Sequence, residues 1–325
     1  MNRQEAQAIL DRFSGKRVLV VGDLMVDEYV WGRVNRVSPE APVLVVDAES
    51  HTFVPGGAAN VVHNLRALGA ETVVAGVIGR DAVGERLIEE LHLLGADTSA
   101  VVHAEDRPTT QKTRIVAGSQ QIVRVDREKR DALPAEAARE LVGRASELLT
   151  VCDALLFSDY DKGVLREDTV RSLLAAARQS GAVVTANPKP VSAVLYAGAD
   201  VAQLNRTEAE QASGAHLTRA PEDTFHAVGA RLRETMGVRN LLVTRSSQGL
   251  TVFKDDGAFV DLPAHLVEVY DGTGAGDSTI AALTLALASG ADVEAAAAVG
   301  NAAGGAVVRH VGVVTAAPNE IAALF

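Results

Sequence analysis

The chain has 325 residues, of which 47% are hydrophobic and 22% are charged, the composition of a soluble globular protein that can bury a sizeable core. Its formal net charge of −11 is spread along the sequence, which argues against a phosphate-backbone partner, so we expect no nucleic-acid binding. The single cysteine, Cys152, excludes an internal disulfide and fits a reducing compartment, and its simplest interpretation is a small buried side chain.

The N-terminal stretch MNRQEAQAILDRF alternates charged and apolar residues at helical spacing and lacks the apolar core of a signal peptide, so we expect a cytoplasmic protein. The longest apolar stretch, around residues 280–308, is interrupted by Asp292, Glu294 and several glycines. A membrane-spanning helix needs about 20 mostly apolar residues. We interpret this stretch as buried helices and expect no membrane association.

Short apolar runs typical of strands alternate with segments that carry apolar residues at three- and four-residue steps. This alternation predicts an α/β protein with a doubly wound, mostly parallel sheet flanked by helices. The expected strands are 18–22, 72–78, 154–157, 182–185, 201–204 and 241–244. The expected helices are 59–68, 84–94, 136–149, 169–179 and 224–235.

Two stretches break the alternation because no helix separates their strands. Residues 34–46 contain β runs, and residues 109–126 have the pattern of a hairpin around Ala117, Gly118 and Ser119. We expect both to form a small antiparallel β lid on a single domain spanning residues 1–325, since no linker or repeat divides the chain. An unpaired apolar edge on that lid would favour a homodimer.

Several common motifs are missing from the sequence. The only Gly-Lys pair, Gly15-Lys16, does not complete a GxxxxGK[ST] motif, which excludes a P-loop. The scattered histidines and one cysteine cannot build a zinc site. The first strand turn, at residues 21–23, also lacks the GxGxxG of a Rossmann dehydrogenase.

Residues 270–280 form a polar, glycine-rich loop that runs into a helix of small residues. Gly274, Ala275 and Gly276 allow backbone N–H groups to converge at the helix N-terminus, where the macrodipole carries about half a positive charge. Charge developing on a transferring phosphoryl group would be stabilised there. Asp277 then has two interpretations, a helix N-cap or a general base for a hydroxyl nucleophile, and spacing alone favours the cap.

The segment YDGTGAGD, ending at Asp277, resembles the C-terminal signature of the ribokinase-like sugar kinases, also called the phosphofructokinase B family. Three further segments resemble motifs of this family in the expected order, namely VVGDLMVDEYVWG at 20–32, PGGAANVVHNLRALGA at 55–70 and SDYDKGVL at 158–165. The resemblance implies a ribokinase-like fold and an ATP-dependent kinase that uses Mg²⁺, with Asp277 as its catalytic base.

Three stretches resemble one branch of the family, the D-glycero-β-D-manno-heptose 7-phosphate kinases of lipopolysaccharide precursor synthesis. They are VNRVSPEAPVLVV at 34–46, TTQKTRIVAGSQQIVRVD at 109–126 and LLVTRSSQGLTVF at 241–253. The implied reaction is phosphorylation of the anomeric hydroxyl to the 1,7-bisphosphate. In that branch the kinase is often fused to a nucleotidyltransferase domain with an HxGH motif, which this sequence lacks, so it resembles the free-standing kinase.

One departure leaves other substrates open. The branch usually has Asp-Pro-Lys where this chain has Asn187-Pro188-Lys189, and ribokinases have Asn-Pro there. The alternatives are another kinase of the same fold, such as a ribokinase, fructokinase or other sugar-phosphate kinase, and a non-catalytic nucleotide-binding protein.

The resemblance also assigns site residues by position. It implies that the sugar contacts Asp23, Asp27, Gly56, Gly57 and Asn60. It implies that nucleotide phosphates, adenine or water-bound Mg²⁺ lie near Asn187, Lys189, Asn205, Glu208, Thr244, Ser246, Gly249 and Asn301, with Glu208 holding the metal through water. From the residues alone, a turn at a strand end is the better interpretation of Asp23, and a tight turn is the better interpretation of the two glycines. The alternative for residues 205–208 is an ordinary helix start.

A phosphorylated sugar needs cations on the lid side of the site. Lys112, Arg114 and Arg124 would share one face of the hairpin if the register places residue 124 opposite the other two. Arginine suits phosphate because its guanidinium group can donate two parallel hydrogen bonds. The alternative is a solvated edge strand protected by charge.

Overall fold

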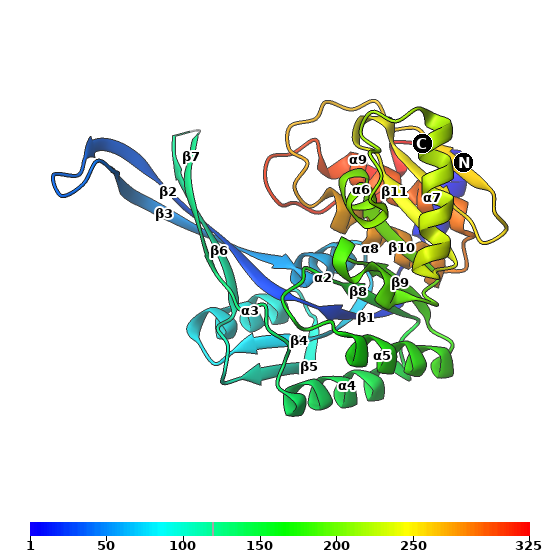
Figure 1. Ribbon diagram of the computed structural model, residues 1–325, viewed down its shortest axis with the longest axis horizontal. Coiled ribbons are helices and arrows are strands. Elements are labelled where there is room, and N and C mark those ends of the chain that lie inside the picture. Colours follow the sequence, from blue (N-terminus) through cyan, green and yellow to red (C-terminus); the bar gives the residue numbers. More distant parts are fainter. Residues whose placement is uncertain (119) are drawn as a thin grey trace.

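The main sheet runs through the body of the protein, with the strand order β13-β12-β11-β10-β9-β8-β1-β4-β5 (Figure 1). The computed structural model describes residues 1–118 and 120–325, so Ser119, the residue expected at the hairpin turn, lies outside the described residues. The strands from β11 to β5 are parallel, and β12 and β13 add an antiparallel edge. The strands are β1 Arg17–Gly22, β4 Glu71–Gly79, β5 Asp97–Ala104, β8 Ala154–Ser158, β9 Val183–Asn187, β10 Val201–Asn205, β11 Asn240–Thr244, β12 Leu250–Phe253 and β13 Phe259–Leu262.

Helices cover both faces of this sheet, which confirms the predicted doubly wound α/β class. One face is covered by α1 Arg3–Leu10, α2 Ala58–Ala67, α3 Ala82–Leu93, α8 Ala275–Ala288, α9 Val293–Val307 and α10 Pro318–Ala322. The other is covered by α4 Ala135–Leu149, α5 Glu167–Ser180, the 3-10 helix η1 Pro190–Tyr196, α6 Arg206–Ser213 and α7 Glu222–Met236.

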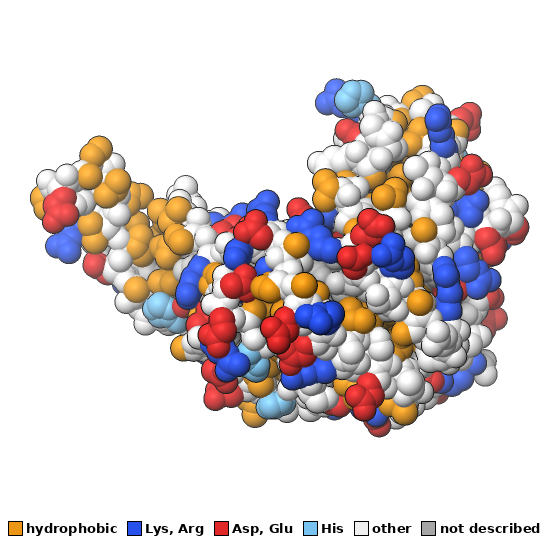
Figure 2. Space-filling view, turned by 60° about the horizontal axis from the view of Figure 1, so that its bottom comes forward, with side chains coloured by type: hydrophobic (Ala, Val, Ile, Leu, Met, Phe, Trp, Pro, Cys, Tyr) orange, Lys and Arg blue, Asp and Glu red, His pale blue; other side chains and the backbone are white. Residues whose placement is uncertain are grey.

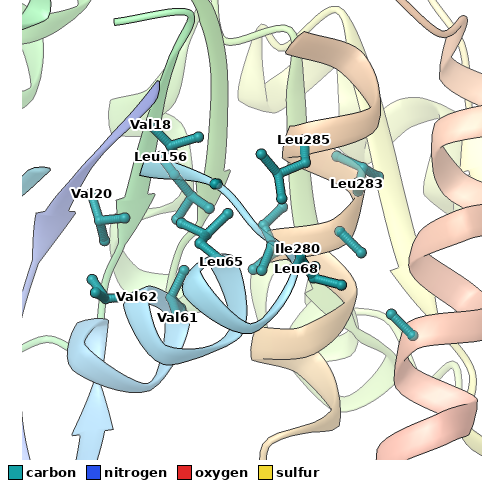
Figure 3. Close-up of a cluster of buried hydrophobic side chains, with 14 of the residues drawn as sticks. Val18, Val20, Val61, Val62, Leu65, Leu68, Leu156, Ile280, Leu283 and Leu285 are labelled. Atoms are coloured by element: carbon teal, nitrogen blue, oxygen red, sulfur yellow. The ribbon is translucent and has the colours of Figure 1, made fainter. Parts of the chain in front are cut away.

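The hydrophobic core has two layers because the central strands are buried on both sides. In β1, Val18 and Val20 pack into one layer, which Figure 3 shows together with side chains of α2 and α8, whereas Leu19 and Val21 pack into the other. A strand buried on both faces has a continuous apolar run rather than an alternating one, which is why these strands are visible in the sequence.

Helix α8 is almost entirely buried, and it packs along α9. The close contact requires glycine at Gly300, because a Cβ there would lie 2.8 Å from the Thr279 carbonyl oxygen. Residues 280–308 are therefore buried helices, as the sequence indicated, and the start of α8 is held rigidly. Among the described residues, no helix combines the length and the apolar character that crossing a bilayer requires.

A second sheet, with the strand order β3-β2-β6-β7, forms the lid. Its strands are β2 Leu24–Val37, β3 Leu44–Gly57, β6 Thr110–Ala117 and β7 Gln120–Arg127. The pairs β2–β3 and β6–β7 are antiparallel, while β2 and β6 pair in parallel. Both expected lid stretches lie in this sheet, but β2 begins at Leu24 and β3 continues to Gly57, so the lid is longer than the sequence indicated.

The far end of the lid projects away from the body as the β2–β3 hairpin (Figure 1). Pairing of β2 with β6 ends at the Gly32–Ala117 pair, so beyond it the hairpin is a two-stranded ribbon. Hydrophobic side chains gather on this projecting arm (Figure 2). They include Val37, Val43 and Leu44, all of which are exposed.

Candidate active site

Polar side chains gather where parallel strands of the main sheet end, which is where ligands of open α/β sheets bind. They line an open cavity of about 160 Å³ between these strand ends and the starts of α6 and α8. The lining residues are Tyr160, Asn187, Lys189, Gln203, Asn205, Glu208, Thr244, Gly274, Gly276 and Asp277.

Asp277 is the third residue of α8, and only 7% of it is exposed. The N-cap of this helix is Gly274, which has a φ of 81° and makes no side-chain cap, so the N-cap interpretation of Asp277 is wrong. Its carboxylate instead accepts two hydrogen bonds from distant parts of the chain. Asn60 Nδ2 donates to Oδ2 over 2.7 Å, and the Tyr160 hydroxyl donates to Oδ1 over 2.8 Å.

The surroundings of Asp277 act on its pKa in opposite directions. Burial raises the pKa above its ordinary value, while the hydrogen bonds from Asn60 and Tyr160 and the charge of Lys189 lower it. A carboxylate that is desolvated yet held by donors has the properties of a general base.

The glycine-rich loop before α8 is held by two polar side chains. Asp271 Oδ1 accepts hydrogen bonds from the backbone and hydroxyl of Thr273, at 2.9 and 2.7 Å, and its Oδ2 accepts from the Gly312 N–H at 3.0 Å. From β10, Gln203 Nε2 donates to the Gly276 carbonyl oxygen at 2.8 Å. The first-turn N–H groups of a helix have no intrahelical partner, so this fixed loop presents donors for an anion.

Lys189, Asn205 and Glu208 form a compact polar group on one side of the cavity. Lys189 Nζ lies 2.7 Å from Glu208 Oε1, and Glu208 Oε2 accepts from the Asn205 N–H at 3.0 Å. The Glu208 N–H in turn donates to Asn205 Oδ1, so these two residues form the capping box of α6. The helix-start interpretation of residues 205–208 is therefore correct, and the same residues line the cavity.

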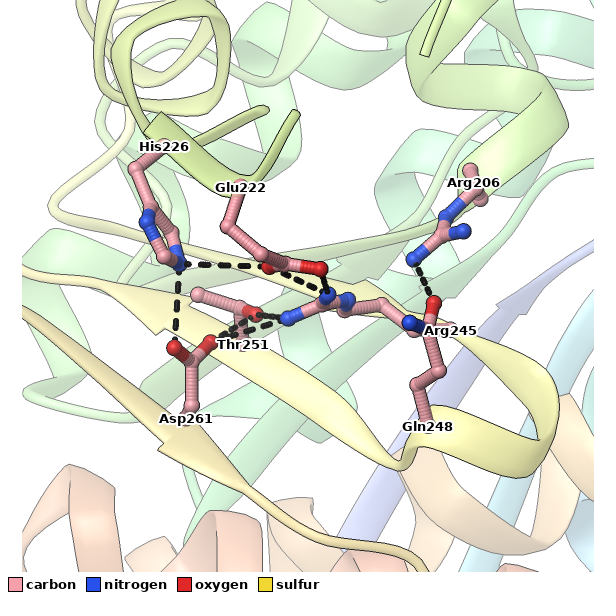
Figure 4. Close-up of polar contacts among 7 residues, drawn as sticks. All are labelled: Arg206, Glu222, His226, Arg245, Gln248, Thr251 and Asp261. Atoms are coloured by element: carbon pink, nitrogen blue, oxygen red, sulfur yellow. Dashed lines mark hydrogen bonds and ion pairs between the residues drawn. The ribbon is translucent and has the colours of Figure 1, made fainter. Parts of the chain in front are cut away.

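The loop after β11 is fixed by a polar cluster between α7 and the antiparallel edge (Figure 4). The buried guanidinium group of Arg245 contacts Glu222 at 2.5 Å and Asp261 at 3.1 Å. The loop contains the short 3-10 helix η2 Ser246–Gln248. Of the residues expected near the nucleotide, Thr244 lines the cavity, whereas Ser246, Gly249 and Asn301 do not belong to its lining.

Gly249 and Asn301 have structural contacts. Gly249 has a φ of +87°, and a Cβ there would collide with the Leu262 carbonyl oxygen and lie 2.5 Å from Ala264 N. Asn301 Nδ2 donates to the Pro263 carbonyl oxygen at 2.8 Å. Both residues therefore fix the chain that follows β13.

The residues expected to hold the sugar lie close together where β2, β3 and α2 meet, and each has partners within the protein. Asp23 is 2% exposed, and its carboxylate accepts hydrogen bonds from the backbone N–H groups of Tyr160 at 2.8 Å and Lys162 at 3.1 Å. These hydrogen bonds anchor the loop that carries Tyr160, and Asp23 also lines a second, smaller cavity with Thr110 and Lys162, so its contact with a sugar stays a prediction. Gly57 opens α2, and a Cβ there would lie 2.6 Å from the Asp23 carbonyl oxygen.

Asn60 and Gly56 also have protein partners. The Asn60 amide donates to Asp277, and Asn60 is 2% exposed, so it supports this carboxylate, while its contact with a sugar stays a prediction. A Cβ on Gly56 would collide with Asp27 Oδ2, so glycine leaves room for that carboxylate.

On the lid, the register places Arg114 opposite Arg124 and Lys112 opposite Asp126, so the three cations share a face, as binding of one phosphate by the lid requires. Arg114 forms an ion pair with Asp27, and Arg124 pairs with Asp126 at 2.8 Å. Among the residues that the structure describes, Lys112 has no carboxylate within ion-pair distance; its ammonium lies 6.0 Å from the centre of the Tyr160 ring.

The sequence motifs did not indicate two residues of the cavity, Tyr160 and Gln203. Tyr160 lies in the SDYDKGVL segment just after a buried strand, and Gln203 is the polar residue within the apolar run of β10. The position of Tyr160 follows the rule that parallel strands deliver functional side chains at their carboxyl ends, and the signal for Gln203 was a polar residue within a buried strand.

A buried carboxylate beside a helix N-terminus, with a lysine in the same cavity lining, suits phosphoryl transfer to a hydroxyl group. Residues 16–320 match the family described as pfkB family carbohydrate kinase. The chain therefore belongs to the pfkB family of carbohydrate kinases.

Curated relatives of the chain include several proteins named bifunctional protein HldE. The chain is 40% identical over 323 residues to the one from Trichlorobacter lovleyi and 41% identical over 325 residues to the one from Pelobacter propionicus. Each match covers 99% of this chain and 65% of the relative, so the chain spans less than two thirds of their length.

Solved structures support the fold. Phosphofructokinase-2 from Escherichia coli in complex with potassium has a TM-score of 0.77 at 18% identity, and Arabidopsis thaliana ribokinase complexed with ribose and ATP has a TM-score of 0.76 at 20% identity. Each match covers 95% of this chain and 98% of the other. At these identities the likeness establishes the ribokinase-like fold alone.

Proposed function

We propose that the chain transfers the γ-phosphoryl group of ATP to the anomeric hydroxyl of D-glycero-β-D-manno-heptose 7-phosphate, giving the 1,7-bisphosphate of lipopolysaccharide precursor synthesis. The kinase class follows from the family. The heptose assignment is supported by three stretches that resemble heptose 7-phosphate kinases and by the identity of about 40% to the HldE proteins.

The observation that carries the choice of a phosphorylated acceptor is Lys112. It projects from the lid toward Tyr160, beside the base, and its burial lowers its pKa below the ordinary value. A partly desolvated ammonium with no carboxylate partner in the described part of the chain is suited to an incoming anion. Arg114 and Arg124 already have carboxylate partners, so we assign the phosphate of the acceptor to Lys112 first.

In this proposal Asp277 removes the proton from the acceptor hydroxyl as that oxygen attacks the γ-phosphorus in line. The new O–P bond forms while the bond to the ADP oxygen breaks, and the proton remains on Asp277 until solvent removes it. The N–H groups from Gly274 to Gly276, together with Lys189, stabilise the negative charge on the transferring phosphoryl group. We assign the sugar to the Asp27 side of the cavity.

The nucleotide side fits Mg²⁺ held through water. Among residues 1–118 and 120–325, no group of three or more His, Cys, Asp or Glu side chains could hold a metal ion directly. Glu208 is near the cavity but accepts from Lys189 and Asn205, which suits contact with metal-bound water rather than direct coordination. Bound there, Mg²⁺ would neutralise charge on the phosphate oxygens.

Replacing Asp277 with Asn tests the base. The substitution preserves shape but removes the proton acceptor, so we expect turnover to fall about 10²–10⁴-fold with ATP affinity retained. Turnover is measured as acceptor-dependent ADP release and ATP affinity by calorimetry. Asp292→Asn is the matched control, because Asp292 caps α9 and Asn is an equally good cap. Near-normal turnover of Asp277→Asn would exclude the base.

The acceptor is tested by a panel of ADP-release assays with heptose 7-phosphate, ribose, fructose and fructose 6-phosphate. We expect the highest kcat/KM for the heptose phosphate. Preference for ribose or fructose would assign the chain to another kinase of the same fold, an alternative that Asn187 favours at one position. If none of the four acceptors stimulates ADP release, the result would favour a non-catalytic nucleotide-binding protein.

We also propose a homodimer formed through the lid. The ribbon of residues 33–48 has two strands and exposes apolar side chains such as Val37 and Leu44. Two-stranded ribbons are marginally stable in water unless a further surface covers them. A second copy of the same ribbon supplies such a surface.

A further inference from the structure

Tyr160 lies at the centre of the site, although no role was assigned to it from the sequence. It follows β8, its side chain is partly buried, and it lines the cavity. Its hydroxyl donates to Asp277 Oδ1, and Asn60 donates to Oδ2, so each carboxylate oxygen has one donor. Burial and the neighbouring Asp277 raise the pKa of Tyr160 far above its ordinary value, which keeps the phenol protonated and able to donate.

Two cations from different parts of the fold lie near the ring of Tyr160. Lys189, from the loop after β9, has its ammonium 5.0 Å from the ring centre, and Lys112, from the lid, has its ammonium 6.0 Å away. Both distances are within the range in which an aromatic ring attracts a cation. The ring therefore lies near one cation from the main body and one from the lid, while its hydroxyl reaches Asp277.

Two buried carboxylates fix the backbone that carries Tyr160. Asp23 accepts the N–H of Tyr160, as described above, and Asp159 Oδ1 accepts the N–H of Asp161 at 2.8 Å. Asp161 has a φ of 54°, a conformation that residues other than glycine adopt infrequently, so this turn is specifically held. Asp159 is itself anchored by hydroxyl groups of η1, with Tyr196 at 2.7 Å.

From this geometry we propose that Tyr160 is a positioning residue of the phosphoryl transfer, whose hydroxyl orients the Asp277 carboxylate toward the acceptor hydroxyl. The inference rests on the proposed function, because it requires Asp277 to be the base. When Asp277 takes the acceptor proton, the phenol keeps its own proton and remains a donor to the carboxyl group. The phenol therefore stabilises the ionised base before the transfer and fixes its direction during it.

The test is the pH dependence of kcat and kcat/KM in Tyr160→Phe. A hydrogen bond to a charged group contributes about 1.5–3 kcal/mol, so we expect kcat to fall roughly 10- to 100-fold with KM for ATP changed less than about threefold. Loss of the donor removes an influence that lowers the Asp277 pKa, so the acidic limb of the profile moves to higher pH. An unmoved limb, or one moved to lower pH, overturns the proposal.

Tyr196→Phe is the matched control. Tyr196 is also buried, and its hydroxyl donates to a buried carboxylate, Asp159, outside the cavity lining. Because Tyr196 anchors Asp159, which holds the turn that carries Tyr160, we expect this variant to lose stability and to move the acidic limb by much less than Tyr160→Phe does. An equal movement in both variants would mean that loss of any buried phenol produces the shift, which overturns the specific role of Tyr160.

Two further measurements keep the proposal testable and separate it from the proposed function. If Tyr160→Phe fails to fold, 3-fluorotyrosine is incorporated into the otherwise unchanged chain and into Tyr196→Phe. Fluorination makes the phenol a stronger donor, so the acidic limb of the pH profile should move to lower pH in both proteins. An acidic limb that does not move contradicts the positioning role of Tyr160. Turnover that survives in Asp277→Asn refutes the base itself, whereas an inactive Asp277→Asn with an unchanged Tyr160→Phe profile refutes the positioning role alone.

Discussion

Asp23 and Asp27 are only four residues apart, but their surroundings are very different. Asp23 is desolvated and points into the loop that carries Tyr160, where its partners are backbone N–H groups. Asp27 lies in β2 on the lid, where it forms an ion pair with Arg114. Burial, together with the nearby Asp159 charge, raises the Asp23 pKa from 3.8 to about 6. The residue therefore has a measurable signature in the stability of the protein.

We predict that the contribution of Asp23 to stability is lost as pH rises. The folded state keeps the proton of Asp23 up to about pH 6, while the unfolded chain releases it near 3.8. The stabilisation is complete below 3.8 and declines through this window, by about 3 kcal/mol for a shift of about two units. Asp23→Asn cannot ionise, so its free energy of unfolding relative to the unaltered protein should rise by a similar amount across the window.

The measurement is urea unfolding of both proteins at pH values below, within and above the window. Asp292→Asn, which changes an exposed helix cap, should follow the unaltered protein at every pH. A difference between Asp23→Asn and the unaltered protein that does not vary with pH would contradict the prediction.

At the same scale, Lys112→Ala should weaken binding of a phosphorylated acceptor. Loss of one charged contact to phosphate, worth about 1.5–3 kcal/mol, predicts a rise in KM of roughly 10- to 100-fold. KM for ATP should stay within about twofold. Arg124→Ala is the control on the same face of the lid: Arg124 is half exposed and pairs with Asp126, so its loss should have a smaller effect. Equal effects of the two variants would contradict the assignment.

At the scale of elements, the turn between β11 and β12 depends on Gly249. Gly249→Ala places a Cβ against the Leu262 carbonyl oxygen in a backbone conformation that L-residues avoid, so we predict a loss of about 3 kcal/mol or more. Gly257→Ala, in the next turn, has a similar φ of +82° but meets no atom within 4 Å, so it should cost only about 1 kcal/mol. The midpoints of thermal unfolding compare the two, and equal costs would show that contact with β13 is unimportant.

Elements of the main sheet were predictable because burial leaves a clear pattern. The strands at residues 18–22 and 241–244 are continuous apolar runs, and β1 and β11 lie within one residue of them. The lid strands were harder to predict, because much of β2 and β3 is exposed on both faces. Such strands need no alternation of apolar and polar residues, so their sequence carries no clear strand pattern. The strand β5 Asp97–Ala104 was missed because its apolar run is short and mixed with polar residues.

For the candidate site, only the residues that lie in recognisable sequence motifs could be predicted. The glycine-rich loop and Asp277 were identified, but no local pattern could reveal that Asn60, 217 residues away, donates to that carboxylate. Nor could a local pattern reveal that the partners of the Asp23 carboxylate lie in a loop 137 residues further along the chain. Long-range contacts of this kind are set by the packing of whole elements.

At the scale of the whole molecule, the lid connects the site to the projecting arm. The strand β2 runs from Leu24 beside the main sheet, past Asp27, to Val37 at the exposed end, and β6 beside it carries Lys112. Contacts at the outer end of the arm can therefore restrain the strands that carry the residues proposed to bind the acceptor. A partner on the arm would thus affect binding as well as association.

The last prediction is that Leu44→Glu dissociates the proposed dimer. A charge on the exposed apolar ribbon opposes burial of that surface, so the variant should sediment as a monomer where the unaltered chain sediments as a dimer. Leu93→Glu is the control, since Leu93 is 83% exposed at the end of α3, away from the arm, and should leave association unchanged. Because the freed arm no longer restrains β2, KM for the acceptor should rise in Leu44→Glu while KM for ATP stays constant. An unaltered chain that sediments as a monomer would exclude the dimer. A Leu44→Glu variant that remains dimeric would place the dimer interface elsewhere.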